Sequence, residues 1–155
     1  MNRREILKSM AGAVAMWASP RILAAQQTGE VRRLADNVAL VDGGGSNVLA
    51  VSTGQGLVLV DSGAPRSGDQ VMAALGNLGP NSKVQTLFNT HYHTDQTGNN
   101  EVFGTAGAKI IAHEHARQWM SSDYWVPDQD RYEQARPKAA RPTETVQSKI
   151  GRAHV

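Results

Sequence analysis

Residues 90–100 read THYHTDQTGNN, which places two histidines and an aspartate at alternate positions. In an extended segment the side chains at i, i+2 and i+4 point the same way, so His91, His93 and Asp95 are predicted to converge on one side of a loop. On a helix the same spacing would fan them around the axis. Imidazole nitrogens and a carboxylate oxygen are ligands that zinc and similar first-row ions take. The stretch therefore predicts a metal site.

The segments upstream of this stretch change from strand patterns to a helix pattern and back. β-Branched and apolar runs at 37–41 and 47–52 flank a glycine-rich turn and predict two strands, and a near-continuous apolar run at 57–61 predicts a buried third. Apolar residues with i, i+4 and i+7 spacing then predict a helix that Ser67 or Asp69 could cap and that Gly79-Pro80 would stop. A short strand over 84–89 leads into the histidines, so the site lies at the carboxyl end of a strand, where open α/β sheets place their ligands.

Downstream, a short helical segment near 99–103, a strand at 109–112 and a helix near 114–120 continue the alternation. The whole pattern predicts an α/β layered arrangement after a β-meander start. From 121 to 149 prolines and aspartates break any regular element, while Tyr124, Trp125 and Tyr132 supply large apolar surfaces. Two interpretations stay open for this segment: a loop over the site, or a surface connection whose aromatic rings pack on the domain.

The stretch T-H-Y-H-T-D-Q-T-G-N-N resembles the central H-x-H-x-D-H motif of the metallo-β-lactamase superfamily of hydrolases, which is usually preceded by Thr and followed by Thr-Gly-Gly-Asn or similar. LVLVDSGA at 57–64 is similar to the early strand of that family, which ends in Asp-x-Gly. The resemblance covers roughly residues 31–120. It implies an α/β fold, the N-terminal half of an αββα four-layer sandwich. The family's third metal-binding histidine, bridging carboxylate and late histidine come from the second half and cannot be assigned here.

The same resemblance implies a role for each matching residue. His91 and His93 bind a first metal ion, Asp95 binds a second ion and orients the bridging water as a catalytic residue, and Asp61 supports the site loop. The implied cofactor is zinc, one or two ions, and the implied reaction is attack of a metal-bound hydroxide on a small-molecule lactam, lactone, thioester or other ester. The alternative is a non-catalytic periplasmic metal-binding or accessory module of the same fold.

Gln96 is the departure from the family pattern, which usually has histidine there as a ligand of the second metal. An amide oxygen is a far poorer donor to zinc than imidazole. Three outcomes are open: a weak or empty second site, a second site retained through the amide oxygen, or a degenerate site that binds without catalysis. We expect a weakened second site, because Asp95 is present and one metal can activate water alone.

Other chemistries find little support in the sequence. His113 and His115 do not form H-E-x-x-H, so capping or surface roles are expected for them. Ser62 lacks the G-x-S-x-G context of a nucleophile, the glycine-rich turn does not match a dinucleotide-binding fingerprint, and no cysteine is present. Sixteen Lys and Arg side chains face fourteen Asp and Glu, and four of the basic and one of the acidic residues lie in 1–25. Twelve basic residues against thirteen acidic ones remain beyond residue 25, which does not favour a nucleic-acid partner.

The two ends of the sequence differ from the domain between them. Residues 1–25 run from adjacent arginines, Arg3 and Arg4, through a weakly apolar stretch to small residues, the pattern of a twin-arginine signal peptide. This pattern predicts the twin-arginine export machinery as a partner and a periplasmic or otherwise exported protein. One codon choice for IGRAHV, residues 150–155, spells a common sequencing adapter, so we expect a non-native tail. Residues 26–149 would then form a partial domain, inactive and poorly stable alone.

Overall fold

A computed structural model describes residues 30–147, so the signal-peptide and tail predictions, at 1–25 and 150–155, lie outside the described residues. Within them no helix is long and apolar enough to cross a membrane. The elements in chain order are β1 (Val31–Ala35), β2 (Val38–Asp42), β3 (Asn47–Thr53), β4 (Gly56–Val60), α2 (Gly68–Gly76), β5 (Val84–Phe88), α3 (Thr94–Thr97), α4 (Asn100–Thr105), β6 (Lys109–His113), α5 (Glu114–Ser121), β7 (Tyr124–Val126), the 3-10 helix η1 (Pro127–Gln129), β8 (Arg131–Glu133), the 3-10 helix η2 (Lys138–Ala140) and β9 (Glu144–Val146).

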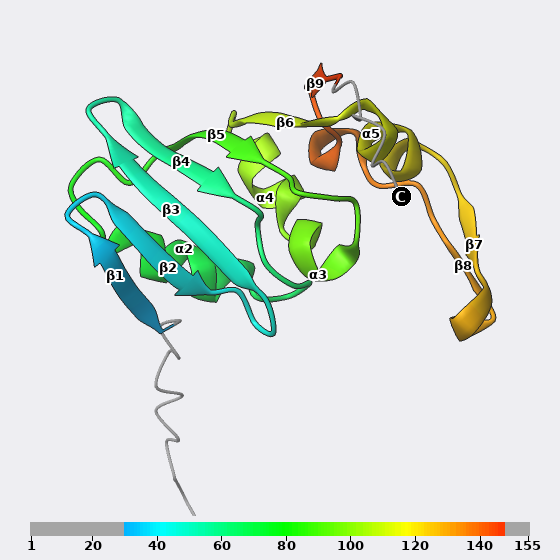
Figure 1. The fold of residues 1–155 in the computed structure, drawn as a ribbon, viewed down its shortest axis with the longest axis horizontal. Helices are drawn as coiled ribbons and strands as arrows, with labels where there is room; N and C mark the ends of the chain where they lie inside the picture. The colour runs from blue at the N-terminus through cyan, green and yellow to red at the C-terminus, as the bar shows by residue number, and fades with distance from the viewer. Residues whose placement is uncertain (1–29, 148–155) are drawn as a thin grey trace, which may run out of the picture.

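Seven of the strands form one sheet in the order β1-β2-β3-β4-β5-β6-β9 (Figure 1). Strands β1 to β4 are antiparallel neighbours, whereas β4, β5, β6 and β9 run parallel. Each parallel step needs a crossover, and α2 and α4 lie in the first two crossovers. The predicted meander followed by an α/β region is confirmed.

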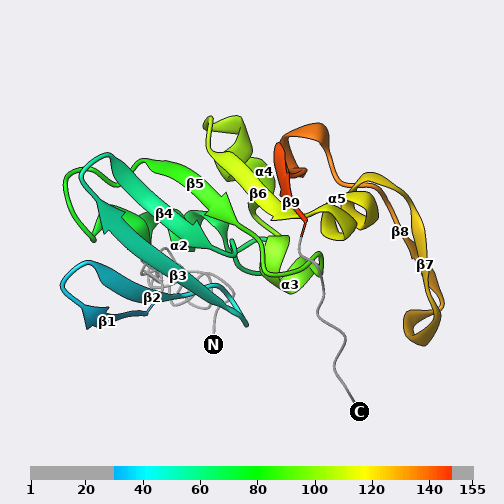
Figure 2. The same ribbon diagram turned by 45° about the horizontal axis from the view of Figure 1, so that its top comes forward.

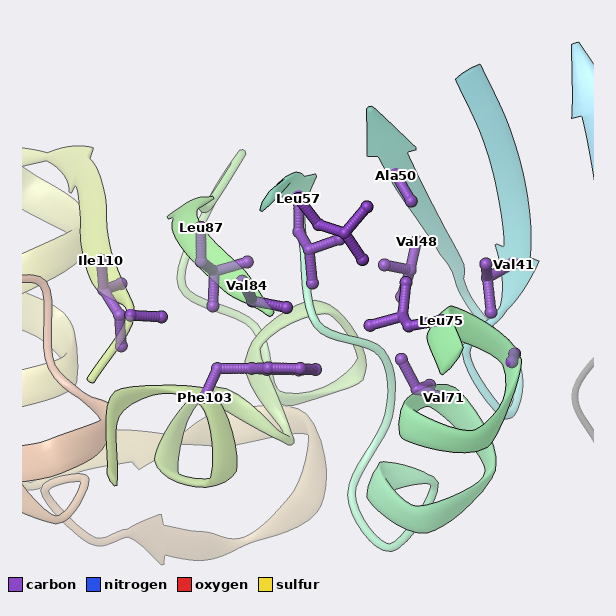
Figure 3. Packing of buried hydrophobic residues seen from close by; sticks show 13 residues of the cluster. Val41, Val48, Ala50, Leu57, Val71, Leu75, Val84, Leu87, Phe103 and Ile110 are labelled. Atoms are coloured by element: carbon purple, nitrogen blue, oxygen red, sulfur yellow. The ribbon is translucent and has the colours of Figure 1, made fainter. Parts of the chain in front are cut away.

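The hydrophobic core lies between one face of this sheet and the helices α2 and α4 (Figure 3). Alternate strand residues point to this face, among them Val48, Leu59 and Leu87, and each is fully buried. Phe103 of α4 is 1% exposed and fills the space under the parallel strands. Burial of one sheet face against two helices gives the sheet its register, because a one-residue slip would expose these side chains.

The opposite sheet face is apolar but only partly covered. Leu49, Val51, Val58 and Val60 point to this face and keep intermediate exposure. In register, Val51 pairs with Val58 and Leu49 with Val60, which makes a continuous apolar surface across β3 and β4. A large sheet with helices on one face and an apolar second face is what one half of a layered sandwich presents.

The structure corrects two expectations about local structure. Residues 121–149 do not lack regular elements, since they form β7, β8, β9 and two 3-10 helices. Two of these residues shape the hairpin turn: Pro127 begins η1, and Asp130 adopts a left-handed conformation with φ 48° between β7 and β8. The resulting hairpin β7–β8 extends away from the main sheet in both ribbon views (Figures 1 and 2). The second correction concerns the histidine stretch.

Candidate metal centre

The histidine stretch follows β5 and is not extended throughout, contrary to expectation. The chain bends over residues 90–92, His93 is extended with φ −63° and ψ 147°, and the single turn α3 begins at Thr94. Asp95 therefore points toward the histidines from the first turn of a helix. The three side chains converge through a bend and a helical turn, because both reverse the direction of the chain within a few residues.

The ligand atoms of His91, His93 and Asp95 lie within 4.8 Å of one another. The two imidazole rings meet edge to face, with ring centroids 4.8 Å apart and an interplanar angle of 83°. His93 and Asp95 are exposed and His91 is half-buried, so an ion could reach the group from solvent. Two imidazoles and a carboxylate fit the donor preference of zinc, which binds nitrogen and oxygen ligands at about 2 Å.

Asp61 supports this group by binding Thr90, the residue just before His91. It is buried at the end of β4, where its two carboxylate oxygens accept hydrogen bonds from the Thr90 backbone N–H (2.9 Å) and the Thr90 hydroxyl (2.7 Å). Burial raises the pKa of the Asp61 carboxyl above its ordinary value, although both Thr90 hydrogen bonds and the nearby His91 act to lower it. Asp61 thus contacts the ligand segment without belonging to the converging group.

Thr90 also fixes the tautomer of His91 by hydrogen-bond accounting. The Thr90 Oγ1 lies 2.9 Å from His91 Nδ1, and its single hydroxyl proton is donated to Asp61. His91 Nδ1 must then carry a proton and donate to Thr90, which leaves Nε2 with the lone pair that a metal requires. Metal-binding histidines usually donate their other ring N–H to a hydrogen-bond acceptor, and here that acceptor is the Thr90 hydroxyl, which Asp61 holds in place.

Gln96 lies on the same turn and turns its amide toward Asp95. Its Nε2 donates to Asp95 Oδ2 over 3.3 Å, and its backbone oxygen accepts a hydrogen bond from the Ser62 backbone N–H (2.7 Å). The amide therefore borders the ligand group as a donor to one of its members. Whether it contacts a metal stays a prediction.

The other histidine pair and Ser62 have the roles that sequence reasoning gave them. His113 Nδ1 accepts a hydrogen bond from the His115 backbone N–H (3.2 Å) and caps α5, so the capping expectation is confirmed. In the part of the chain that the structure describes, neither histidine joins the metal-ligand group. Ser62 is fully buried and donates a hydrogen bond to Asn100, which excludes it as a nucleophile facing solvent.

A cavity of about 590 Å³ opens beside His93 and Asp95. Its apolar wall consists of aromatic rings: Tyr92 stacks on Trp119 with centroids 5.2 Å apart and an angle of 13°, and Tyr124 meets both rings edge on. Trp125, on the β7–β8 hairpin, lines the same cavity. Burial raises the pKa of the Tyr124 phenol above its ordinary value. Of the two interpretations for residues 121–149, the hairpin beside the site favours the first.

A family model described as the metallo-beta-lactamase superfamily matches residues 41–152. The chain belongs to this superfamily. No curated protein matches its sequence.

Solved structures of metallo-beta-lactamases share this fold. BJP-1, a subclass B3 metallo-beta-lactamase of Bradyrhizobium japonicum, is 26% identical with a TM-score of 0.63, over 81% of this chain and 49% of BJP-1. The MIM-2 metallo-beta-lactamase is 25% identical with a TM-score of 0.62, over 79% of this chain and 47% of MIM-2. This metallo-beta-lactamase superfamily chain therefore spans about half the length of these relatives. The expected half-sandwich fold is confirmed.

A third structure shares the fold. It is a HARLDQ motif mutant of the metallo-beta-lactamase from Cronobacter sakazakii and is 21% identical with a TM-score of 0.62, over 76% of this chain and 47% of that one.

Sequence reasoning missed several residues around the centre of this superfamily member. No motif residue type marks Tyr92 or Trp119. Tyr92 lies between His91 and His93 in the sequence, which was the one sign that it is near the site. The buried asparagines Asn89, Asn99 and Asn100 also went unassigned. The signals were a cluster of polar residues at both ends of the histidine stretch and, for Asn100, the place of the last residue in the quoted motif, but nothing in the sequence indicates that these asparagines are buried.

Proposed function

We propose that the protein is a metal-dependent hydrolase whose centre is formed by His91, His93 and Asp95. The observation that carries this proposal is the convergence of three ligand atoms within 4.8 Å beside an open cavity. Membership of the metallo-beta-lactamase superfamily supports it. Because the chain spans about half the length of its solved relatives, the activity is proposed for the complete gene product.

The proposed chemistry needs a metal that these residues are suited to hold. A bound zinc ion lowers the pKa of water from about 15.7 to about 7 and so supplies hydroxide at neutral pH. His91 offers Nε2, because Thr90 occupies its Nδ1, and His93 adds a second imidazole. Asp95 carries the carboxylate that orients the attacking water and can take up its proton.

The proposed substrate is a small lactam, lactone, thioester or other ester. Its reacting carbonyl would lie against His93 and Asp95, the two members of the ligand group that line the cavity. The stacked rings of Tyr92 and Trp119 would contact an apolar substituent, since aromatic faces bury large apolar areas. The subclass B3 enzymes among the solved relatives favour a lactam as the first compound to try.

Zinc is proposed as the metal, with one ion held firmly and a second held weakly. Gln96 replaces the imidazole that the family pattern has for the second ion, and its amide donates to Asp95. A degenerate, non-catalytic site is the weaker alternative, because the HARLDQ motif that describes a Cronobacter sakazakii metallo-beta-lactamase also ends in Asp-Gln. Glutamine at this position is therefore compatible with an enzyme.

The deciding experiment combines metal analysis with hydrolysis by the complete gene product. We expect bound zinc and turnover of at least one member of a panel of lactams, lactones, thioesters and esters. His93→Ala should abolish both, whereas His115→Ala, a histidine outside the ligand group, should leave both unchanged. Bound zinc without turnover of any panel member would overturn the enzyme and favour the accessory module.

We also propose export by the twin-arginine machinery. The support is the order of residues 1–25, in which Arg3 and Arg4 precede a weakly apolar stretch. That route carries folded proteins, which suits a protein that acquires its metal before export. Replacement of both arginines by lysine should keep the protein in the cytoplasm on cell fractionation, and unchanged export of this variant would contradict the proposal.

A further inference from the structure

A buried polar network lies directly beneath the metal-ligand segment. Asn100 and Ser62 are 0% exposed, and Asn89 and Asn99 are nearly so. Polar side chains are buried only when their hydrogen bonds are made, so such a network specifies one arrangement of the backbone around it.

Asn100 is the centre of this network. Its Nδ2 donates to Asn89 Oδ1 (2.8 Å) and to the backbone oxygen of Ala140 (3.0 Å). Its Oδ1 accepts from Asn89 Nδ2 (3.1 Å) and from the Ser62 hydroxyl (2.9 Å). A carboxamide has two donor hydrogens and two acceptor lone pairs, so every hydrogen-bonding position of Asn100 is used.

The reciprocal pair of amides closes the base of the ligand segment. Asn89 immediately precedes Thr90, and Asn100 begins α4 just after the segment, with His91, His93 and Asp95 between them. Ser62 adds a tie to the middle of the segment, because its backbone N–H donates to the Gln96 backbone oxygen (2.7 Å) while its hydroxyl proton is donated to Asn100. The two ends and the middle of the segment are therefore held by hydrogen bonds of Asn89, Asn100 and Ser62.

Asn99 strengthens the same end of the segment. Its Nδ2 lies within hydrogen-bond distance of two backbone oxygens, those of Ser62 (2.7 Å) and Ala64 (2.9 Å), and of the Ser67 hydroxyl (2.8 Å). These hydrogen bonds join the start of α4 to the loop after β4, which also carries Asp61. Through Ala140, Asn100 extends the connection to η2, which follows the β7–β8 hairpin beside the cavity.

We propose that Asn100 is a positioning residue of the metal centre, acting through Asn89 and Ser62 on the backbone that carries His91, His93 and Asp95. The proposal rests on the proposed metal site and adds a residue that contacts no ligand. Only a carboxamide completes the set: aspartate would lose both donors, and leucine would leave Asn89, Ser62 and Ala140 without their partner.

The test uses the complete gene product and two measurements on each variant. One is the zinc dissociation constant, measured by competition with a chromogenic chelator, and the other is the visible spectrum of the Co²⁺-loaded protein. Asn100→Asp has nearly the same shape and is expected to weaken zinc binding about tenfold or more and to change the Co²⁺ spectrum, because supporting residues usually contribute that much. Ser62→Ala removes only one hydroxyl and is the second variant, for use if Asn100→Asp does not fold. It should change the dissociation constant and the Co²⁺ spectrum in the same direction, by a smaller amount.

A control separates positioning from general loss of stability. Leu75 of α2 is 1% exposed and belongs to the hydrophobic core, so Leu75→Ala should lower stability without removing a hydrogen bond of the polar network. We expect this variant, once folded, to keep the wild-type dissociation constant and Co²⁺ spectrum. If folded Asn100→Asp or Ser62→Ala protein has the wild-type dissociation constant and the wild-type Co²⁺ spectrum, the positioning role of Asn100 is overturned and the proposed metal site is not. Absence of zinc binding by the wild type would instead overturn the proposed metal site.

Discussion

Gln96 is the residue at which this chain differs from the pattern of its superfamily, and its surroundings explain what a histidine would change. The amide donates to Asp95 Oδ2 and adds no imidazole to the ligand group. Its backbone oxygen is anchored by Ser62 whatever side chain it bears. A substitution at this position should therefore alter the ligands and leave the backbone in place.

We expect Gln96→His to raise the amount of zinc bound per protein molecule, because imidazole is a better zinc ligand than an amide. The measurement is the metal-to-protein ratio after equilibration with excess zinc and removal of the free ion. Gln96→Asn, which keeps an amide, serves as the matched control. An unchanged ratio in Gln96→His would show that this side chain does not reach a metal.

Thr90 offers a second test at the residue scale. Thr90→Val keeps the shape of the side chain and removes the hydroxyl between Asp61 and His91, so the His91 ring loses the partner that orients it. We expect zinc affinity to fall about tenfold, and Thr90→Ser, which keeps the hydroxyl, to restore most of it. Equal affinities for the valine and serine variants would contradict the assigned tautomer.

At the scale of elements, the packing of η2 on α4 depends on one glycine. A Cβ atom added at Gly104 would collide with the backbone oxygen of Ala139, so the two elements approach as closely as they do only because residue 104 has no side chain. The same contact brings Ala140 to Asn100. Gly104 is thus part of what brings the end of the hairpin segment back to the centre.

Gly104→Ala should lower the free energy of unfolding of the complete protein by about 1–3 kcal/mol, the usual cost of overpacking. Gly76→Ala is the matched control, since Gly76 ends α2 with open space where its Cβ would lie. Alanine there should be neutral or stabilising by up to about 1 kcal/mol, because glycine weakens helices. Urea denaturation of the two variants side by side measures the difference.

The elements with strong apolar periodicity could be predicted from the sequence, and those fixed by distant contacts could not. The strands from β2 to β6 and the helix α2 follow runs and spacings that a buried face imposes. The short α3 is held by the loop after β4, where the Ser62 N–H donates to the Gln96 oxygen and the Gly63 oxygen accepts from the Gly98 N–H. The β7–β8 hairpin depends on a left-handed Asp130 and a Trp125–Tyr132 cross-strand pair. Neither arrangement leaves a periodic signal.

For the candidate site the convergence of three side chains was predictable and its support was not. His91, His93 and Asp95 stand out by residue type and spacing, and the structure brings them together, although through a helical turn; their binding of a metal stays a prediction. Asn100 stands at the end of the Thr-Gly-Asn-Asn stretch of the motif, but its role could not be predicted, because its four hydrogen bonds reach residues 11 to 40 positions away. Tyr92 and Trp119 are likewise joined only by the fold.

At the scale of the whole molecule, the sheet face formed by Leu49, Val51, Val58 and Val60 is apolar and only partly buried. An apolar sheet face of this kind favours association when nothing packs on it. The matched part of this chain covers about half of each solved relative, so we expect the second half of the fold to cover this face in a protein of their length.

We expect Val58→Lys to have opposite effects on the two lengths of chain. In residues 26–149 alone the charge should reduce aggregation, because it interrupts an exposed apolar surface. In the complete protein it should lower the melting temperature, because an unpaired charge would be buried. Gln85→Lys, at an exposed position of β5, should change neither. A Val58→Lys variant that melts at the wild-type temperature in the complete protein would show that this face stays open to water.

The stack of Tyr92 on Trp119 gives the centre a fluorophore of its own. The Tyr92 ring meets the His93 ring edge on, with centroids 4.6 Å apart. The Trp119 indole stacks on the Tyr92 ring, with centroids 5.2 Å apart. A paramagnetic ion held by His91 and His93 would therefore sit close enough to quench indole emission. Comparison with Trp119→Phe isolates that signal from the other tryptophans, so metal loading can be followed in real time without an attached dye.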